Sequence, residues 1–383
     1  MRGWRRNTGA GRPRSSRPRL AGRAFATIVA ASLLLWAGAA WAAPDGHILA
    51  FLAKYPAADA NQDGTLTPSE VWLFRSKQKT GKRGRSPALR DAQRALSAMY
   101  TPARADASKR YGPQPGKKLK VFILSGQSNM VGQGLSAELP DALKRPDERV
   151  LMFEEGRWQP LRPLRVTFGP EIAFAHALAK AWPEETIGVV KQAVGGTGIL
   201  AWSPTWTKEK ADLTGDGKKG NLWKALCDKV RRAREAADCE ILGFVWQQGG
   251  KDMSKIETGK QYLAHLRELI EGLRKETGVA DLPLVLGSYR LPGVPDDLSN
   301  IDPAAFEVMG RPGAGYVLQA QFDAQEELAP AKMLPLRGLE RHPKNVHYNT
   351  KGQLELGKLF AEGYLELVKA NPAARTETAT QSP

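Results

Sequence analysis

The chain contains few of the residues on which several protein classes depend. Its 383 residues include two cysteines and five histidines, which excludes a disulfide-rich scaffold and a cysteine-rich zinc module. No unit of about 20 to 50 residues repeats along the chain, which excludes a solenoid or a propeller. Hydrophobic residues make up 42% of the sequence, so disorder along the whole length is excluded as well.

Acidic residues are absent from residues 1–42, which carry eight arginines. An apolar run from Ala24 to Ala40 follows these arginines, and the sequence Ala40-Trp41-Ala42 closes it. A basic start, a short apolar stretch and a site of small residues are typical of a secretory signal peptide. The run is shorter than most membrane-spanning segments. We therefore expect cleavage near Ala42 and a secreted or periplasmic protein.

The positive charge lies mostly in the first 120 residues of the chain. The net charge is +16, and residues 75–120 alone hold fourteen basic and two acidic residues. They lack the interleaved aromatic residues of a nucleic-acid surface, so we expect no nucleic acid as partner. We interpret residues 79–117 as a basic linker that contains a short helix over residues 86–99. Residues 75–120 also suit association with anionic envelope polymers.

A calcium-binding pattern follows the predicted signal peptide. Oxygen-bearing and turn-forming residues take the positions that a twelve-residue EF-hand loop requires: Asp59, Asn61, Asp63, Gly64, Thr65, Thr67 and Glu70. Apolar residues at helical spacing flank the loop on both sides, which predicts an EF-hand-like helix-loop-helix over residues 43–78. Extracellular modules of this kind bind calcium weakly. We expect one structural calcium ion here, with Thr65 contributing its main-chain carbonyl.

Beyond residue 118, short apolar runs alternate with amphipathic helical patterns. This alternation predicts a mainly parallel sheet with helices on both faces, and such sheets carry their chemistry beyond the carboxyl ends of the strands. The predicted strands cover residues 120–125, 150–153, 187–194, 241–247, 284–289 and 316–320, and the predicted helices cover residues 170–181, 221–237, 262–276 and 352–369. Residues 371–383 form a polar tail that we expect to be disordered.

Four loop segments at the edge of this sheet carry residues suited to acyl transfer. Ser128 follows the first strand, Gly195 the third and Gln248 the fourth, and His347 precedes the last helix. Serine needs a base to become a nucleophile, and histidine is the base suited to neutral pH. The main-chain amides of Ser128 and Gly195 and the Gln248 side chain could stabilise the oxyanion.

The motifs that contain these residues resemble one hydrolase superfamily. GQSNM, GGT, WQQG and VHYNTKGQLELG are similar to segments of the SGNH/GDSL hydrolases, and within them of the sialate O-acetylesterase type (carbohydrate esterase family 6). The resemblance covers residues 118–370 and implies a flavodoxin-like three-layer α/β/α sandwich. It also implies a serine esterase that removes acetyl groups from acetylated carbohydrates without a catalytic cofactor. The roles it implies are a nucleophile at Ser128, a base at His347, oxyanion or substrate contacts at Gly195 and Gln248, and turn or substrate contacts at Asn129 and Gln127.

One departure from the family pattern concerns the acid that orients the histidine. The family usually has aspartate three residues before this histidine, where the chain has Lys344. Asp252, Glu171 or a main-chain carbonyl are the alternatives, and we list Asp252 with the catalytic residues. A lost orienting acid can cost about 10⁴ in rate. The alternative function is therefore a weakened or inactive carbohydrate-binding protein stabilised by calcium.

Two further questions stay open at this stage. His342 is close enough in sequence to His347 to be a rival base. Cys227 and Cys239 lie on either side of a predicted helix end, and after export they could be paired or remain buried thiols.

Overall fold

The computed structural model describes residues 46–78, 86–100, 106, 108–289, 294–306 and 310–372. The chain divides into two units, Met1–Pro44 and Asp45–Pro383, and all the described residues belong to the second. The predicted signal peptide and the tail from residue 373 onward lie outside the described residues. No helix within the described ranges is both long and apolar enough to cross a membrane.

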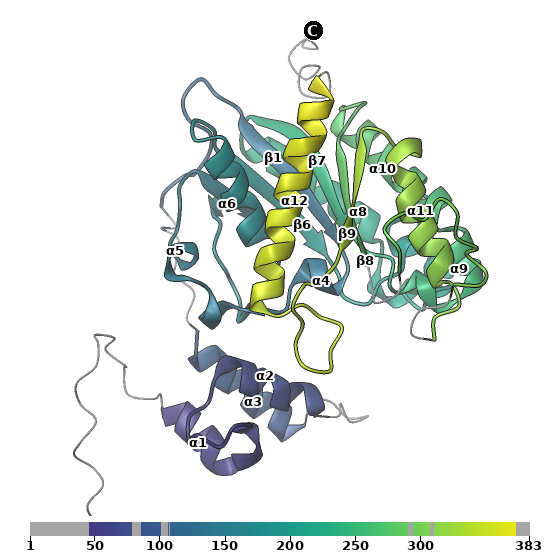
Figure 1. Ribbon diagram of the computed structural model, residues 1–383. Helices are drawn as coiled ribbons and strands as arrows, with labels where there is room; N and C mark the ends of the chain where they lie inside the picture. Colours follow the sequence, from purple (N-terminus) through teal and green to yellow (C-terminus); the bar gives the residue numbers. More distant parts are fainter. Residues whose placement is uncertain are drawn as a thin grey trace, which may run out of the picture. The chain divides into compact units, whose positions relative to one another are not determined.

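A seven-stranded sheet forms the centre of the fold (Figure 1). Its order is β4-β3-β6-β1-β7-β8-β9, and every neighbouring pair is parallel except β3 and β4. This confirms the predicted mixed α/β class with a mainly parallel sheet, although β6 lies between β3 and β1, unlike the flavodoxin order. The strands are β1 (Leu119–Gly126), β3 (Val150–Glu154), β4 (Arg157–Pro160), β6 (Ile187–Ala193), β7 (Cys239–Gln247), β8 (Leu284–Tyr289) and β9 (Ala331–Leu336).

Helices cover both faces of this sheet because alternate residues of each central strand point to opposite sides. In β1, Val121 and Ile123 join one hydrophobic cluster and Phe122 and Leu124 join the other, all fully buried. Figure 1 shows two helices in front of the sheet, α6 (Glu171–Ala181) and α12 (Thr350–Ala370). The other face packs against α8 (Leu222–Ala236), α10 (Tyr262–Thr277) and α11 (Ala314–Glu327). The predicted three-layer arrangement is therefore present.

The strand predicted over residues 316–320 is wrong, because these residues lie inside α11. The apolar segment Tyr316–Ala320 is short enough to suit a strand. The buried positions, however, recur at helical spacing through Ala314, Val317, Leu318, Gln321 and Ala324. The sequence analysis missed both edge strands of the sheet, β4 and β9, and the short strands β2 and β5.

Short elements connect the layers, and several of them border the edge of the sheet that carries the predicted site. They are α4 (Ser128–Val131), β2 (Gly134–Leu135), η2 (Ser136–Glu138), α5 (Asp141–Lys144), β5 (Thr167–Phe168), η3 (Ile199–Trp202), α7 (Lys208–Asp212), η4 (Gly217–Lys219), η5 (Asp252–Ser254) and α9 (Ile256–Lys260). Strands β2 and β5 form a separate antiparallel pair.

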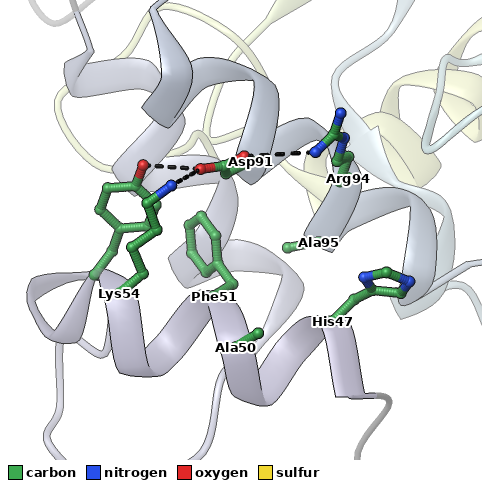
Figure 2. A pocket seen from close by; sticks show the side chains of 8 residues that line it. His47, Ala50, Phe51, Lys54, Asp91, Arg94 and Ala95 are labelled. Carbon is green, nitrogen blue, oxygen red and sulfur yellow. Dashed lines mark hydrogen bonds and ion pairs between the residues drawn. The ribbon is translucent and has the colours of Figure 1, made fainter.

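Three helices near the start of the described chain form their own cluster, which we call the helical segment (residues 46–78 and 86–99). They are α1 (Gly46–Lys54), α2 (Pro68–Lys77) and α3 (Pro87–Ala98), with η1 (Pro56–Ala58) between the first two. Figure 2 shows Lys54 of α1 paired with Asp91 of α3 beside a cavity of about 220 Å³. Phe51 and Ala95 are buried in the same cluster. Residues 87–98 are thus a helix, close to the short helix expected over residues 86–99, and it packs within this cluster.

Candidate active site

Ser128 stands where the chain leaves the central strand β1. Gly126 ends this strand with φ +145°, and a Cβ there would lie 2.2 Å from the carbonyl oxygen of Gln247, so only glycine fits. Gln127 then donates its N–H to the same carbonyl oxygen, over 3.0 Å. The chain continues from β1 towards β3 on one side of the sheet and from the neighbouring β7 towards β8 on the other, so Ser128 lies at a topological switch point. Ligands of open α/β sheets bind at such points.

Gly195 lies directly against Ser128. A Cβ built on Gly195 would be 3.7 Å from the Cβ of Ser128, which is ordinary van der Waals contact. Lys219 holds this second turn by donating from Nζ to the carbonyl oxygens of Gly195 (3.0 Å) and Gly196 (2.7 Å). Within the described ranges, the N–H groups of Ser128 and Gly195 donate to no protein acceptor. The two predicted oxyanion donors are therefore adjacent and free.

Asn129 connects the turn at Ser128 to the loop that carries His347. Its side-chain oxygen accepts the N–H of Tyr348 (3.1 Å), and its side-chain nitrogen donates to the carbonyl of Val346 (3.3 Å). The Asn129 side chain thus binds the residues on both sides of His347 and is itself only 2% exposed. This places the segment around His347 beside the residue that follows Ser128. No hydrogen bond joins the His347 ring to Ser128 in the part of the chain that the structure describes.

Tyr289 completes this polar group, and the sequence analysis missed it. Its hydroxyl accepts from the side-chain nitrogens of Gln127 (3.4 Å) and Asn129 (3.3 Å) and donates to the Gln247 side chain (3.1 Å). Burial is the main reason that the pKa of Tyr289 is raised, so the phenol stays protonated. Because Tyr289 ends β8, the strand-end rule that selected Ser128 could have selected it too.

The surroundings of His347 keep its imidazole neutral. Burial lowers the pKa of His347 below its usual value, and the charge of His342 lowers it further. A neutral imidazole can accept a proton, which is what a general base requires. Within the described ranges, no carboxylate is hydrogen bonded to the His347 ring. The rival base His342 is occupied instead, since its Nε2 lies 2.8 Å from the carbonyl oxygen of Gln133.

Asp252 has partners other than His347. Its carboxylate accepts from the Gln248 side chain (2.6 Å) and from the main-chain N–H of Ile199 (3.1 Å), and it is fully buried. Burial raises its pKa to about 7. With these contacts Asp252 does not orient His347, which is the role predicted for it. Asp252 anchors the turn after β7 to the turn after β6.

The Gln248 side chain also differs from its predicted role. Its Nε2 donates to the carbonyl oxygen of Thr197 (2.8 Å) and to Asp252. Because both N–H bonds of the amide are used, none remains for an oxyanion. Glu171, the other candidate for the orienting acid, pairs with Lys191 over 2.5 Å and accepts the N–H of Gly169 over 3.0 Å. It does not contact His347 either.

Lys344, in the place of the family's aspartate, is an exposed turn residue. The N–H of Asn345 donates to the carbonyl of His342 (3.1 Å), so Pro343 and Lys344 are the central residues of a turn. Lys344 has φ +54°, the left-handed conformation that a type II turn requires at its third position. The geometry of this turn therefore determines the backbone conformation of Lys344.

A cavity of about 210 Å³ opens close to α4, the short helix that begins at Ser128. Val131 of α4 and Ala193 at the end of β6 are part of its wall. Its charged lining residues are Glu154, Arg162, Arg165, Glu171, Lys191 and Lys229. The two acids pair with the two lysines, and Arg162 donates to the carbonyl of Pro160 and to the Gln159 side chain, while Arg165 adds a further positive charge to the lining.

The predicted calcium loop lies between α1 and α2 with the expected backbone turn. Gly64 has φ +80° and donates its N–H to Asp59 (2.9 Å), and the other Asp59 oxygen is buried without a partner. Burial would raise the pKa of Glu70, but hydrogen bonds from Thr67, Ala60 and Asn61 outweigh it, and the pKa lies below its usual value. No cluster of three or more histidine, cysteine, aspartate or glutamate residues in the described ranges is arranged to hold a metal ion. The predicted side-chain ligands therefore bind loop N–H groups instead of converging.

Cys227 and Cys239 are free thiols. Burial raises the pKa of each to about 12, so both stay protonated and unreactive. This answers the question that the sequence left open about their pairing.

Comparisons with known proteins show the family to which this chain is similar. Residues 118–366 match the model of a family described as carbohydrate esterase, sialic acid-specific acetylesterase. A probable carbohydrate esterase of Arabidopsis thaliana is 26% identical over 274 residues, which are 64% of this chain and 90% of the relative. The solved structure of the Arabidopsis protein has the same fold, with a TM-score of 0.51 at 24% identity over 65% of this chain and 99% of that chain. A carbohydrate acetylesterase from Xanthomonas citri aligns at 16% identity over 66% and 57% of the two chains, with a TM-score of 0.48.

Proposed function

The chain belongs to the sialic acid-specific acetylesterase family of carbohydrate esterases, and on this premise we propose that Ser128 and His347 catalyse the removal of acetyl groups. The Ser128 hydroxyl attacks the acetyl carbonyl while His347 takes its proton. The N–H groups of Ser128 and Gly195 stabilise the oxyanion. His347 then protonates the leaving sugar hydroxyl, and water hydrolyses the acetyl-serine to free acetate.

One observation carries this proposal: the main-chain N–H groups of Ser128 and Gly195 donate to no protein acceptor in the described ranges, and a Cβ built on Gly195 would lie 3.7 Å from the Cβ of Ser128. The test is turnover of p-nitrophenyl acetate. Ser128→Ala should abolish it, whereas Ser254→Ala, which changes an exposed serine of η5, should leave it unchanged. Equal rates for wild type and Ser128→Ala would refute the proposal.

We assign the substrate to acetylated acidic sugars. Arg165 adds a positive charge to the lining of the cavity beside Val131, which suits the carboxylate of a sialic acid, and the family description names sialic acid. Arg165→Ala should raise KM for an O-acetylated sialic acid about tenfold, since a charged hydrogen bond contributes about 1.5 to 3 kcal/mol, and should leave p-nitrophenyl acetate turnover unchanged. Lys180→Ala, which removes an exposed charge from α6, is the matched control. An equal effect on both esters would contradict the assignment.

A second candidate function follows because no carboxylate in the described ranges is hydrogen bonded to the His347 ring. Without an orienting carboxylate the rate could fall by about 10⁴, which would leave a carbohydrate-binding protein. It predicts that wild type and Ser128→Ala bind an acetylated sialic acid with equal affinity and that neither releases acetate above the buffer rate. Acetate release by the wild type alone would decide in favour of the esterase.

We propose that the loop from Asp59 to Glu70 binds one calcium ion and stabilises the helical segment. The turn at Gly64 and the unpartnered oxygen of Asp59 support it, and binding would redirect the other carboxylates from loop N–H groups to the ion. Calorimetry on the full chain should give a Kd of about 10⁻⁴ to 10⁻³ M. Glu70→Ala should abolish the binding heat, and Glu209→Ala on α7 should not. An unchanged heat in Glu70→Ala would remove the site.

Secretion and surface association complete the proposal. The basic start, the apolar run and the small-residue site of residues 1–42 support export, and N-terminal sequencing of exported protein should find a new terminus near Ala42. The basic residues between 75 and 120 support binding to anionic envelope polymers. Retention of the protein on isolated envelopes should fall as salt is raised; salt-independent retention would contradict an electrostatic attachment.

A further inference from the structure

We propose that Trp72, on α2 of the helical segment, positions the loop that carries His347. The indole of Trp72 stacks on the imidazole of His342, with ring centroids 3.7 Å apart and an interplanar angle of 14°. Both side chains are buried, with 5% and 2% of their surfaces exposed. The proposal rests on the proposed esterase function, and it places a positioning residue outside residues 118–366, which match the family.

His342 transmits this contact to His347 through the main chain. Its N–H donates to the carbonyl oxygen of His347 (3.0 Å), and Arg341 forms an antiparallel bridge with Tyr348. The imidazole ring of His342 is also held in place, because its Nε2 bonds to the carbonyl oxygen of Gln133. A carbonyl oxygen only accepts, so Nε2 carries the proton. The stacked ring therefore has one orientation, and the carbonyl of the catalytic histidine is bound to the same residue.

A second tie holds α2 at the other end of the loop. Ser69 of α2 donates to one carboxylate oxygen of Glu138 (2.5 Å), and Thr350, which begins α12, donates to the other (2.6 Å). The Thr350 hydroxyl also accepts the N–H of Leu135 (2.8 Å). The His347 loop thus runs between two points, His342 and Thr350, that are both linked to α2.

The neighbouring aromatic of α2 packs elsewhere and provides a control. Phe74 contacts Phe51 at 5.5 Å and Tyr55 at 5.1 Å between ring centroids, inside the helical segment. Trp72 and Phe74 therefore separate two effects of a truncation on this helix. Losing Phe74 weakens the packing of the helical segment, whereas losing Trp72 also removes the support behind His342.

The test uses the full chain and p-nitrophenyl acetate, a substrate that needs no sugar contact. Trp72→Ala should lower kcat about tenfold to a hundredfold with KM nearly unchanged, since displacements of about 1 Å can cost 10² in rate. Trp72→Phe, which keeps a stacking ring, should restore most of kcat. Phe74→Ala should lower the free energy of unfolding without this loss of kcat. An unchanged kcat in Trp72→Ala, or an equal loss in Phe74→Ala, would overturn the proposal.

A second measurement separates failure of this inference from failure of the esterase function. In histidine-labelled protein, stacking on the indole should shift the ring protons of His342 upfield in the NMR spectrum. Trp72→Ala should abolish that shift and also move the ring signals of His347. If the wild type showed no Ser128-dependent turnover, the function would fail and this spectrum would still decide the positioning. Unmoved His347 signals in Trp72→Ala would refute it.

Discussion

Replacing Asn129 with alanine should damage the site more than the fold. The substitution removes the acceptor of the Tyr348 N–H and the donor to Val346 and Tyr289. Since these bonds hold the residues on both sides of His347, the imidazole should lose its position relative to Ser128. Folding should survive, because the two hydrophobic clusters that flank the sheet are untouched.

The magnitudes follow from the partners that Asn129 leaves behind. Tyr348 is fully buried, and an unsatisfied buried N–H costs about 1 to 3 kcal/mol. Val346 is 48% exposed, so water can replace the lost donor to its carbonyl. The hydroxyl of Tyr289 keeps Gln127 and Gln247 as partners. We therefore expect a loss of about 2 kcal/mol in the free energy of unfolding and a fall in kcat of about 10².

Urea denaturation and p-nitrophenyl acetate kinetics measure the two effects separately. The matched control is Asn221→Ala, which removes the N-terminal cap of α8 and should cost about 1 kcal/mol of stability with kcat unchanged. The reasoning would be refuted if Asn129→Ala kept the wild-type kcat, or if Asn221→Ala lost activity to the same extent.

Three further changes have outcomes set by the structure. The pKa of Asp252 is raised from 3.8 to about 7 by burial, so the folded state holds this proton more tightly than the unfolded state does. The free energy of unfolding should therefore fall by up to about 4 kcal/mol as the pH rises from 4 to 7. Asp252→Asn should remove that slope in urea denaturation, and an unchanged slope would contradict the shift. Lys344→Gly should stabilise the protein by up to about 1 kcal/mol, since glycine adopts the left-handed conformation without strain, and kcat should change less than twofold; a large loss would mean that the lysine side chain acts in catalysis. Cys227 and Cys239 should react with a thiol reagent only after unfolding, because burial raises the pKa of both to about 12; rapid labelling of the native protein would show that they are exposed.

The strand ends were predictable from sequence because they depend on local backbone geometry. Gly126 has φ +145°, which glycine adopts readily, and the glycine marks the turn to Ser128 in the sequence itself. The central strands were also predictable, since fully buried strands are continuous apolar runs. Tyr316–Ala320 imitated such a run over too few residues to show the helical period of α11.

The partners of the polar side chains were not predictable, because they come from segments far apart in the sequence. Asp252 is bound by Ile199, 53 residues away, and Asn129 binds Tyr348, 219 residues away. Sequence spacing indicates which side chains reach the same edge of the sheet. It does not show which side chains bind one another and so lose a donor for substrate, as Gln248 does when it donates to Asp252. The stacking of Trp72 on His342 depends on the docking of a separate helix, for which the sequence contains no pattern.

Labelling with a phosphonyl fluoride tests the central claim most directly, because this reagent forms a stable bond with a serine only when a base activates the hydroxyl. Peptide mass spectrometry should find the phosphonyl group on the peptide that contains Ser128. The labelling rate should fall at least about 10²-fold in His347→Ala, as expected for the loss of a general base. Because His347 must be neutral, and its pKa lies below the usual value, labelling should stay fast down to mildly acidic pH and fall only below that pKa. Labelling of another residue, or an equal rate in His347→Ala, would contradict the account.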